Sequence, residues 1–341
     1  MEYRYILEKC SKKYICPNPN CRIKSFVRYI DTTNQEYLPE CYGRCDREMK
    51  CGYWLNPYKD GYIKKLNEQD QVFKRPSGAS FNSKPVCSRP PVFIPAEILK
   101  ATMRGWDQNT FIQNLLNRIP FPMDAKDVSN VICLYQLGTI CKGSRTGSVT
   151  FPFIDVNQNI RAIQVKQFDT STHTTNTDFL HSIIERHHQG NSKPLPVWLS
   201  EYLQNEKKVT CLFGEHLLNK YPNNPVALVE APKTAIIGTL YFGFPEKTTD
   251  MLWLAVYNLS SLNYEKCKVL GGRRVYLFPD LSEEGRAFEL WSKAVQQFAH
   301  KIPEAHFKIS QLLEQKADAE DRINGLDLAD YLLRLDWKLF R

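Results

Sequence analysis

The sequence lacks long hydrophobic runs. Met251–Tyr257 is among the longest and has only seven apolar residues, whereas a membrane helix needs about 18. Charged residues stand at Glu2 and Arg4, and no apolar segment follows them as it would in a secretory signal. Internal repeats are absent, and so is any Gly-Lys-Ser/Thr motif of a P-loop motor. These absences predict a cytoplasmic protein that neither spans nor contacts a membrane.

Positive charge is concentrated in the first third of the 341 residues, and the formal net charge is +8. Residues 1–105 hold 19 Lys and Arg against 11 Asp and Glu, whereas residues 106–341 hold 26 of each kind. Hydrophobic residues make up 43%, which is ordinary for a folded chain. The asymmetry predicts a polyanionic partner, most simply nucleic acid. A solvated charged surface without a ligand is the alternative.

Six of the 11 cysteines lie within the first 51 residues. Disulfide frameworks belong to small secreted domains, so metal binding explains this cluster better. Cys16 and Cys21 form a C-x4-C pair, and Cys45 and Cys51 form a C-x5-C pair after an insert of 23 residues. Two such pairs are typical of a zinc ribbon, in which four thiolates close a structural Zn²⁺ site.

Cys41 is the alternative to Cys45 as a zinc ligand by spacing, since it would give a C-x3-C pair. We prefer Cys45, since Gly43 lies before it and Gly52 follows the next cysteine. Glycine lets the backbone turn tightly around a metal.

Residues 22–30 are predicted to form a strand between the two cysteine pairs. Alternation places Arg22, Lys24, Phe26 and Arg28 on one face. Cations interleaved with a ring are typical of a single-stranded DNA surface, where bases stack and phosphates meet positive charge. A solvated strand face is the alternative. In the middle region, Lys142 and Arg145 beside a glycine-rich turn are further candidates for binding nucleic acid, with a solvated hairpin as the alternative.

Composition divides the chain into four parts. Residues 1–73 form the zinc-ribbon domain, and a proline-rich linker follows over residues 74–95. Residues 96–222 combine helical periodicity with strand character, as expected of an α+β region. Residues 223–341 form an α/β domain. The predicted fold class is therefore a multi-domain α/β protein.

The last part alternates apolar strands with helices. The predicted strands are 226–229, 252–256, 274–278 and 306–309, and the predicted helices are 232–240, 283–298 and 326–340. This alternation predicts a parallel sheet covered by helices. Ligands of such sheets bind at the carboxyl ends of strands, where Glu230 and Asp280 stand. The two carboxylates therefore suggest a Mg²⁺ site, and helix capping by each of them is the alternative.

The motif Val-Glu230-x-x-Lys233-Thr234-Ala, followed by Leu-Phe-Pro-Asp280, resembles the Toprim domain of primases, topoisomerases and related nucleases. The cysteine pairs ahead of it complete the zinc-ribbon-plus-Toprim order of bacterial and phage-type primases. Residues 42–53 and 211–218 resemble primase-like proteins of bacterial plasmids and mobile elements.

The resemblance implies a catalytic Glu230, Asp280 and Lys233, with Mg²⁺ bound for phosphodiester chemistry. Toprim families place a second aspartate where this sequence has Ser282, and Glu283 or Glu284 is the nearby carboxylate expected to compensate. Ser282, Glu284 and Asp280 are thus the predicted Mg²⁺-binding residues. The implied function is primase-like nucleotidyl transfer on single-stranded DNA, with replication or mobilisation proteins as partners. The alternatives are a catalytically inactive DNA-binding accessory factor of a mobile element and a Toprim nuclease.

Overall fold

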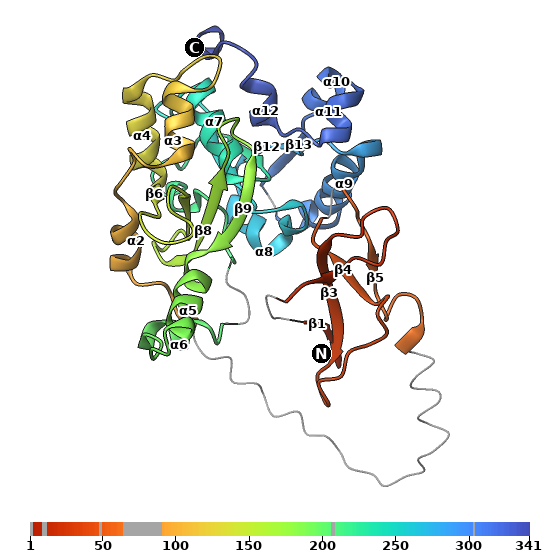
Figure 1. The fold of residues 1–341 in the computed structure, drawn as a ribbon. Coiled ribbons are helices and arrows are strands. Elements are labelled where there is room, and N and C mark those ends of the chain that lie inside the picture. Colours follow the sequence, from red (N-terminus) through yellow and green to blue (C-terminus); the bar gives the residue numbers. More distant parts are fainter. Residues whose placement is uncertain (1–2, 9–11, 48–49, 64–90, 206–208, 303) are drawn as a thin grey trace. The chain divides into compact units, whose positions relative to one another are not determined.

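The computed structural model describes residues 3–8, 12–47, 50–63, 91–205, 209–302 and 304–341. The chain forms two compact units, Met1–Arg89 and Pro90–Arg341 (Figure 1). Most of the linker predicted over residues 74–95 lies outside the described residues. Among the residues that are described, no helix is long and apolar enough to cross a membrane.

The first unit is a small antiparallel sheet built around one long central strand. That strand, β3, pairs with β1, β2 and β4, and β4 pairs with β5. The strands are β1 (Tyr5–Leu7), β2 (Tyr14–Ile15), β3 (Lys24–Asp31), β4 (Gly43–Cys45) and β5 (Trp54–Leu55). Two small clusters fill its interior, one rich in tyrosine and one around Cys16, Phe26 and Cys45. An interior of this size provides little hydrophobic stabilisation on its own.

Two details of this unit differ from the sequence prediction. The strand expected to begin at Arg22 begins at Lys24, because Arg22 has a left-handed backbone (φ 48°) that interrupts an extended strand. Gly43 lies inside β4, where a Cβ atom would be 2.2 Å from the Val27 carbonyl oxygen and 2.4 Å from the Phe26 ring. Glycine is therefore needed at residue 43 for close packing against β3, and not for a turn around the metal.

The second unit begins with an antiparallel sheet in the order β6-β7-β8-β9. Its strands are β6 (Gly138–Thr139), β7 (Val149–Ile154), β8 (Ile160–Phe168) and β9 (Thr174–Phe179). The helices of this part are α2 (Ala96–Thr102), α3 (Thr110–Asn117), α4 (Ala125–Tyr135), α5 (Leu180–Gly190) and α6 (Val197–Tyr202). Every residue of β7 is buried, so this sheet has a covered interior as well as a solvent-facing edge at β9.

The remainder of the second unit contains a four-stranded, fully parallel sheet, as predicted, in the order β11-β10-β12-β13. Its strands are β10 (Val226–Val229), β11 (Leu252–Ala255), β12 (Arg274–Phe278) and β13 (His306–Ile309). The helices are α7 (Pro232–Phe242), α8 (Tyr264–Cys267), α9 (Arg286–Phe298), α10 (Leu312–Lys316), α11 (Ala319–Asn324) and α12 (Leu328–Leu332). β10 and β11 are entirely buried, as expected for parallel strands covered on both faces.

The helices at the end of the chain differ from the prediction of one helix over residues 326–340. The structure has α12 and then a separate 3-10 turn over Trp337–Phe340. The single helix expected over residues 326–340 is interrupted at Asp336. Its side chain accepts a hydrogen bond from the Lys338 backbone N–H and so caps the new turn. Leu290 on α9 is 43% exposed.

Strand order determines where ligands have access to this sheet. The chain runs from β10 outward to β11 and then returns across β10 to form β12 on its other side. The carboxyl ends of β10 and β12 therefore flank the point at which the strand order reverses, the usual ligand-binding position in open α/β sheets. Glu230 follows β10 directly, and Asp280 lies two residues after β12.

Candidate functional site

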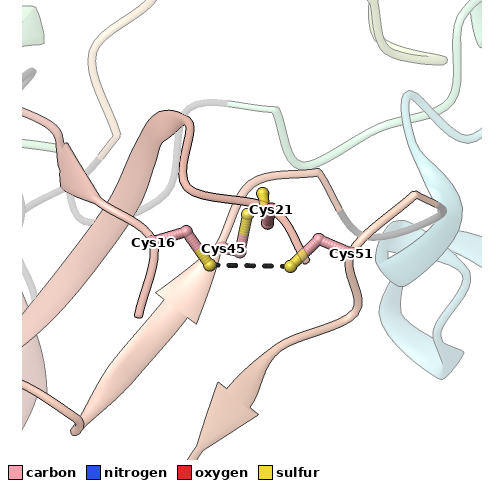
Figure 2. A group of neighbouring side chains, drawn as sticks. All are labelled: Cys16, Cys21, Cys45 and Cys51. Carbon is pink, nitrogen blue, oxygen red and sulfur yellow. Dashed lines mark hydrogen bonds between the residues drawn. The ribbon is translucent and has the colours of Figure 1, made fainter. Parts of the chain in front are cut away.

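Four cysteines converge in the first unit, as Figure 2 shows. The Sγ atoms of Cys16, Cys21, Cys45 and Cys51 all lie within 4.8 Å of one another, and those of Cys16 and Cys51 are 3.5 Å apart. Tetrahedral zinc with Zn–S bonds of about 2.3 Å separates its sulfur ligands by about 3.8 Å. Cys41 instead packs against the tyrosine-rich cluster. The geometry fits a structural Zn²⁺ site whose ligands include Cys45 and not Cys41.

Polar side chains surround the four sulfur atoms. Asn18 Nδ2 donates to Cys51 Sγ (3.4 Å), Arg47 Nη1 donates to Cys21 Sγ (3.6 Å), and the Ser25 hydroxyl lies 3.1 Å from Cys45 Sγ. Hydrogen bonds of this kind orient metal ligands and stabilise their negative charge. Burial raises the pKa of the Cys16 thiol to about 12. Metal binding must therefore displace the proton of the Cys16 thiol, which couples zinc binding to the folding of the unit.

A hollow of about 670 Å³ lies beside β3, and we call it the basic groove. Its lining residues include Lys12, Lys13, Tyr14, Arg22, Lys24 and Arg28. Arg22 and Lys24 are exposed, whereas Arg28 lies 5.4 Å from the Tyr14 ring centroid and 4.8 Å from that of Tyr37. The groove therefore combines exposed surface cations with a cation held between two rings.

The structure corrects the prediction that Phe26 stacks on bases. Its side chain is only 1% exposed and packs with Cys16 and Cys45, with its ring edge-on to Tyr53. The reason is that the four-cysteine cluster needs an apolar neighbour, so this face of β3 points partly into the interior. Tyr14, on the neighbouring strand β2, is the partly accessible ring of the groove.

Lys142 and Arg145 lie in the turn between β6 and β7, in the second unit. Lys142 is exposed, whereas the Arg145 guanidinium lies 3.7 Å from Asp178 Oδ2, a carboxylate that Arg186 also contacts. The ion pair reduces the charge that Arg145 can offer to a phosphate. A role for either residue in binding nucleic acid remains a prediction.

The carboxyl ends of β10 and β12 carry a buried acidic site. Burial, reinforced by the neighbouring Glu230 and Asp327 carboxylates, raises the pKa of Asp280 well above its usual value. Asp280 Oδ1 is buried and has no hydrogen-bond partner among the residues that the structure describes. A buried carboxylate oxygen that lacks a donor and lies in a field of other carboxylates fits a hard divalent cation such as Mg²⁺.

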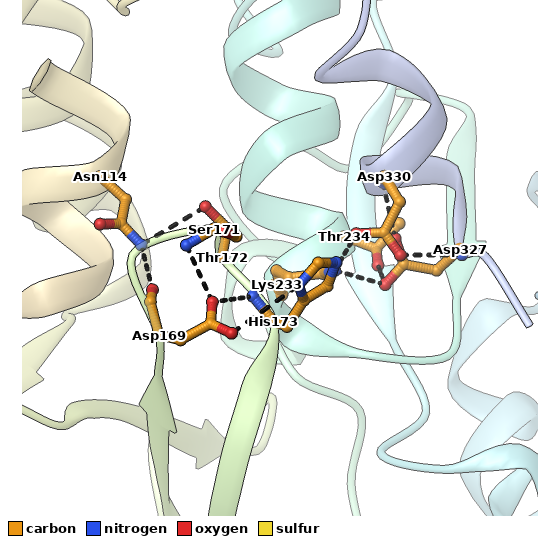
Figure 3. A network of polar contacts seen from close by, with 9 residues as sticks. All are labelled: Asn114, Asp169, Ser171, Thr172, His173, Lys233, Thr234, Asp327 and Asp330. Carbon is orange, nitrogen blue, oxygen red and sulfur yellow. Dashed lines mark hydrogen bonds and ion pairs between the residues drawn. The ribbon is translucent and has the colours of Figure 1, made fainter. Parts of the chain in front are cut away.

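Helix α12 contributes two further carboxylates, shown in Figure 3. Lys233 Nζ, near the start of α7, lies 2.9 Å from Asp327 Oδ2 and 2.6 Å from Asp330 Oδ1. Thr234 Oγ1 also donates to Asp327 Oδ2 (3.2 Å). Burial opposes the charge on Lys233, but the two carboxylates outweigh it and raise the pKa of Lys233. Lys233 thus joins α7 to α12 and offsets part of the negative charge.

Lys166 on β8 belongs to the same electrostatic environment. Burial and the charge of Lys233 lower the pKa of Lys166, while the carboxylates of Asp327, Glu230 and Asp280 oppose that shift. We define the acidic site as the following six residues: Lys166, Glu230, Lys233, Asp280, Asp327 and Asp330. The antiparallel and parallel sheets of the second unit both contribute to it.

Ser282 and Glu284, the other predicted Mg²⁺-binding residues, have different surroundings. The Ser282 hydroxyl accepts a hydrogen bond of 2.7 Å from the Ala287 backbone N–H and so caps the first turn of α9. Glu284 is exposed and has a left-handed backbone (φ 60°). Neither arrangement lends support to a metal-binding role for these two side chains.

Sequence reasoning missed Asp327 and Asp330. Asp327-Leu-Ala-Asp330 after Gly325 has the spacing of a capping box, and the structure contains that box. Recognising it would have placed a helix start at Asp327. It would not have shown that this helix lies against α7.

The fold and these sites define a class of protein: a four-cysteine zinc-ribbon unit followed by an α/β unit with an acidic site at the ends of parallel strands. The chain belongs to the family described as domain of unknown function DUF6371, whose model matches residues 109–281, just over half of the chain. A zinc beta-ribbon finger model matches residues 3–68 and supports a structural zinc ion. A search of curated proteins finds no match.

Several solved primase structures are similar to this chain at low sequence identity. The primase fragment of the bacteriophage T7 primase-helicase protein is 12% identical over 88% of this chain and 89% of that chain, with a TM-score of 0.33. The Aquifex aeolicus primase (zinc binding and RNA polymerase domains) is 12% identical over 98% and 79%, with a TM-score of 0.37. The DnaG catalytic core is 12% identical over 70% and 81%, with a TM-score of 0.41.

We expect one zinc ion per purified chain, measured by elemental analysis. Cys45→Ser removes a sulfur ligand and should lower the zinc content to less than half, with loss of structure in the first unit. Cys41→Ser is the matched control and should keep its zinc, because Cys41 lies outside the cluster. Equal zinc content in both variants would show that the ligand set is wrong.

We expect Asp280→Asn to weaken binding of Mn²⁺, a stand-in for Mg²⁺, by about tenfold or more, equivalent to about 1.4 kcal/mol. The neutral amide removes a charged oxygen ligand that hard cations prefer. Ser282→Ala and the exposed control Asp107→Asn should change the affinity less than about twofold. Titration monitored by electron paramagnetic resonance measures all four proteins. Loss of binding in Ser282→Ala with retention in Asp280→Asn would contradict this assignment.

Proposed function

We propose that this protein is a primase-like enzyme that transfers nucleotides on a single-stranded DNA template with Mg²⁺ at the acidic site. The observation that carries the proposal is the electrostatic coupling of Asp280 to Glu230 and Asp327 where the strand order of the parallel sheet reverses. Buried carboxylates in excess of the nearby lysines are suited to divalent cations and phosphate chemistry. The resemblance of residues 226–280 to Toprim domains agrees with this proposal.

When bound, Mg²⁺ would neutralise phosphate charge and orient the reacting oxygens. Glu230, Asp280 and Asp327 would hold the ion. Lys233 keeps the α12 carboxylates in position through its two ion pairs. Lys166 approaches from β8 with a buried amine, and it would attract the phosphates of an incoming nucleotide.

The basic groove is the proposed binding surface for the template. Its cations, Lys12, Lys13, Arg22, Lys24 and Arg28, face one acidic lining residue, Glu40. Phosphates would contact the exposed Arg22 and Lys24. A base would stack on Tyr14, whose ring already lies against the Arg28 guanidinium. Cations with an aromatic surface are the usual means of binding single strands without sequence preference.

A non-catalytic DNA-binding role, such as an accessory factor of a plasmid or mobile element, is the second candidate. It is favoured by Ser282, which replaces the second aspartate of the Toprim pattern and has its hydroxyl engaged by Ala287. The two candidates share the basic groove and differ in whether the acidic site performs chemistry.

The primase proposal predicts Mg²⁺-dependent incorporation of labelled nucleotides on single-stranded DNA. Glu230→Gln and Asp280→Asn should each reduce incorporation on the order of 100-fold, because each removes charge that stabilises the reacting phosphates. Asp107→Asn should retain activity. DNA binding without product in Mg²⁺ or Mn²⁺ would favour the accessory role, and cleavage of the template would favour a nuclease.

The groove proposal predicts that Arg22→Ala and Lys24→Ala together weaken single-stranded DNA binding. They should also reduce the slope of log affinity against log salt concentration by about 0.7 for each phosphate that the variant no longer neutralises. Fluorescence anisotropy at several salt concentrations measures both quantities. Lys293→Ala removes an exposed lysine of α9 and should leave both unchanged. An unchanged slope in the double variant would place the DNA elsewhere.

A further inference from the structure

A second cavity lies in the second unit, and it shares no residue with the acidic site. Its volume is about 1000 Å³. The turn between β7 and β8, the segment before β10, and α8 with its flanks enclose it. Its lining residues include Asp155, Arg161, Cys211, Glu215, Tyr264 and Lys266.

Lys266 is a buried cation at this cavity. The residue is 5% exposed, and its Nζ donates to the Val256 carbonyl oxygen (2.6 Å) and lies 5.9 Å from the Tyr257 ring centroid. In the part of the chain that the structure describes, no carboxylate oxygen lies within 4.0 Å of this Nζ. An ammonium group has three N–H donors, and burying them without acceptors is unfavourable.

Two carboxylates in the lining of the cavity, Glu215 and Asp155, already accept hydrogen bonds. Glu215 Oε2 accepts from the Leu212 N–H (2.8 Å), and Oε1 accepts from the Val156 N–H (3.3 Å). Asp155 accepts from backbone N–H groups of its own turn and from Arg161 Nε (2.6 Å). Burial raises the pKa of Glu215 to about 7, so this side chain carries less than a full negative charge near neutral pH.

Unused donors also belong to the lining of the cavity. Besides Lys266, the Arg161 guanidinium lines the cavity, and within the described residues its Nη atoms form no hydrogen bond. Its planar face lies 4.5 Å from the Phe93 ring centroid, which fixes its orientation. A cavity with free donors and occupied acceptors suits an anion rich in acceptor oxygens.

We propose that this cavity binds the phosphate group of a mononucleotide, with Lys266 and Arg161 donating to the phosphate oxygens. A volume near the upper end of ordinary small-molecule sites, about 300–1,000 Å³, leaves room for the sugar and base. Tyr264, 36% exposed at the cavity, offers a ring beside that space. The site requires no metal and is independent of the proposed catalysis.

Isothermal titration of the full chain with adenosine monophosphate, without added Mg²⁺, tests the proposal. The wild type should bind adenosine monophosphate and, more weakly, inorganic phosphate, and it should not bind adenosine. Lys266→Met should weaken binding at least tenfold, and the exposed control Lys293→Met should not. Asp280→Asn should bind as the wild type does, which separates this site from the acidic site.

A milder variant keeps the test decisive if Lys266→Met misfolds. Lys266→Gln preserves length and polarity but removes the charge, and it should lower the affinity in the same direction. Stabilisation by ligand gives a second measure, because a phosphate compound that binds only the folded chain raises its melting temperature. Wild-type affinity in a folded Lys266→Met or Lys266→Gln variant, or loss of binding in Asp280→Asn alone, would overturn the proposal.

Discussion

Lys233 links two segments of the acidic site by ion pairs. It lies near the start of α7, and its amine contacts two carboxylates at α12, of which Asp330 is 97 residues further along the chain. The side chains of all three residues are little exposed to solvent. The ion pairs therefore take the place of the hydration that these charged groups have lost. Removal of one partner from such a buried network typically costs about 3–5 kcal/mol, because the remaining charge is left uncompensated. These ion pairs, together with the hydrogen bond from Thr234 to Asp327, support the docking of α12 and hence the position of Asp327.

The first unit has a different constraint, which is its small hydrophobic interior. Its interior consists of a few tyrosines and the cluster around Cys16, Phe26 and Cys45, which is too little apolar surface for an independent fold. Zinc bound by four thiolates would join β3 and β4 to the loops that carry the other cysteines. The same requirement explains Gly43, which allows β4 to approach the Phe26 ring. In both units, then, polar or ionic links join segments that packing alone would hold weakly.

Local signals predicted some elements well. β10 has the predicted bounds, and α7 begins at Pro232, because a short apolar strand and a proline at the first helical position are both encoded by neighbouring residues. The convergence of Cys16, Cys21, Cys45 and Cys51 was also predictable from spacing. The prediction for Phe26 was wrong, since alternation along a strand does not reveal which face a small metal-centred interior needs. Asp327 could not be predicted, because its electrostatic coupling to Asp280 arises only when distant segments of the chain pack together.

Ser282 shows that the acidic site differs from a site in which two aspartates of one loop supply the negative charge. In the Toprim pattern that this sequence resembles, two aspartates separated by one residue supply negative charge from the same turn. Here the second position is Ser282, whose hydroxyl caps α9. Asp327 contributes negative charge at Asp280 from another part of the chain. Its position relies on the buried ion pair with Lys233 and on the capping box that starts α12. The electrostatics of the acidic site are therefore tied to the stability of the C-terminal helices, so that partial undocking of α12 would remove charge from the site without any change at Glu230 or Asp280.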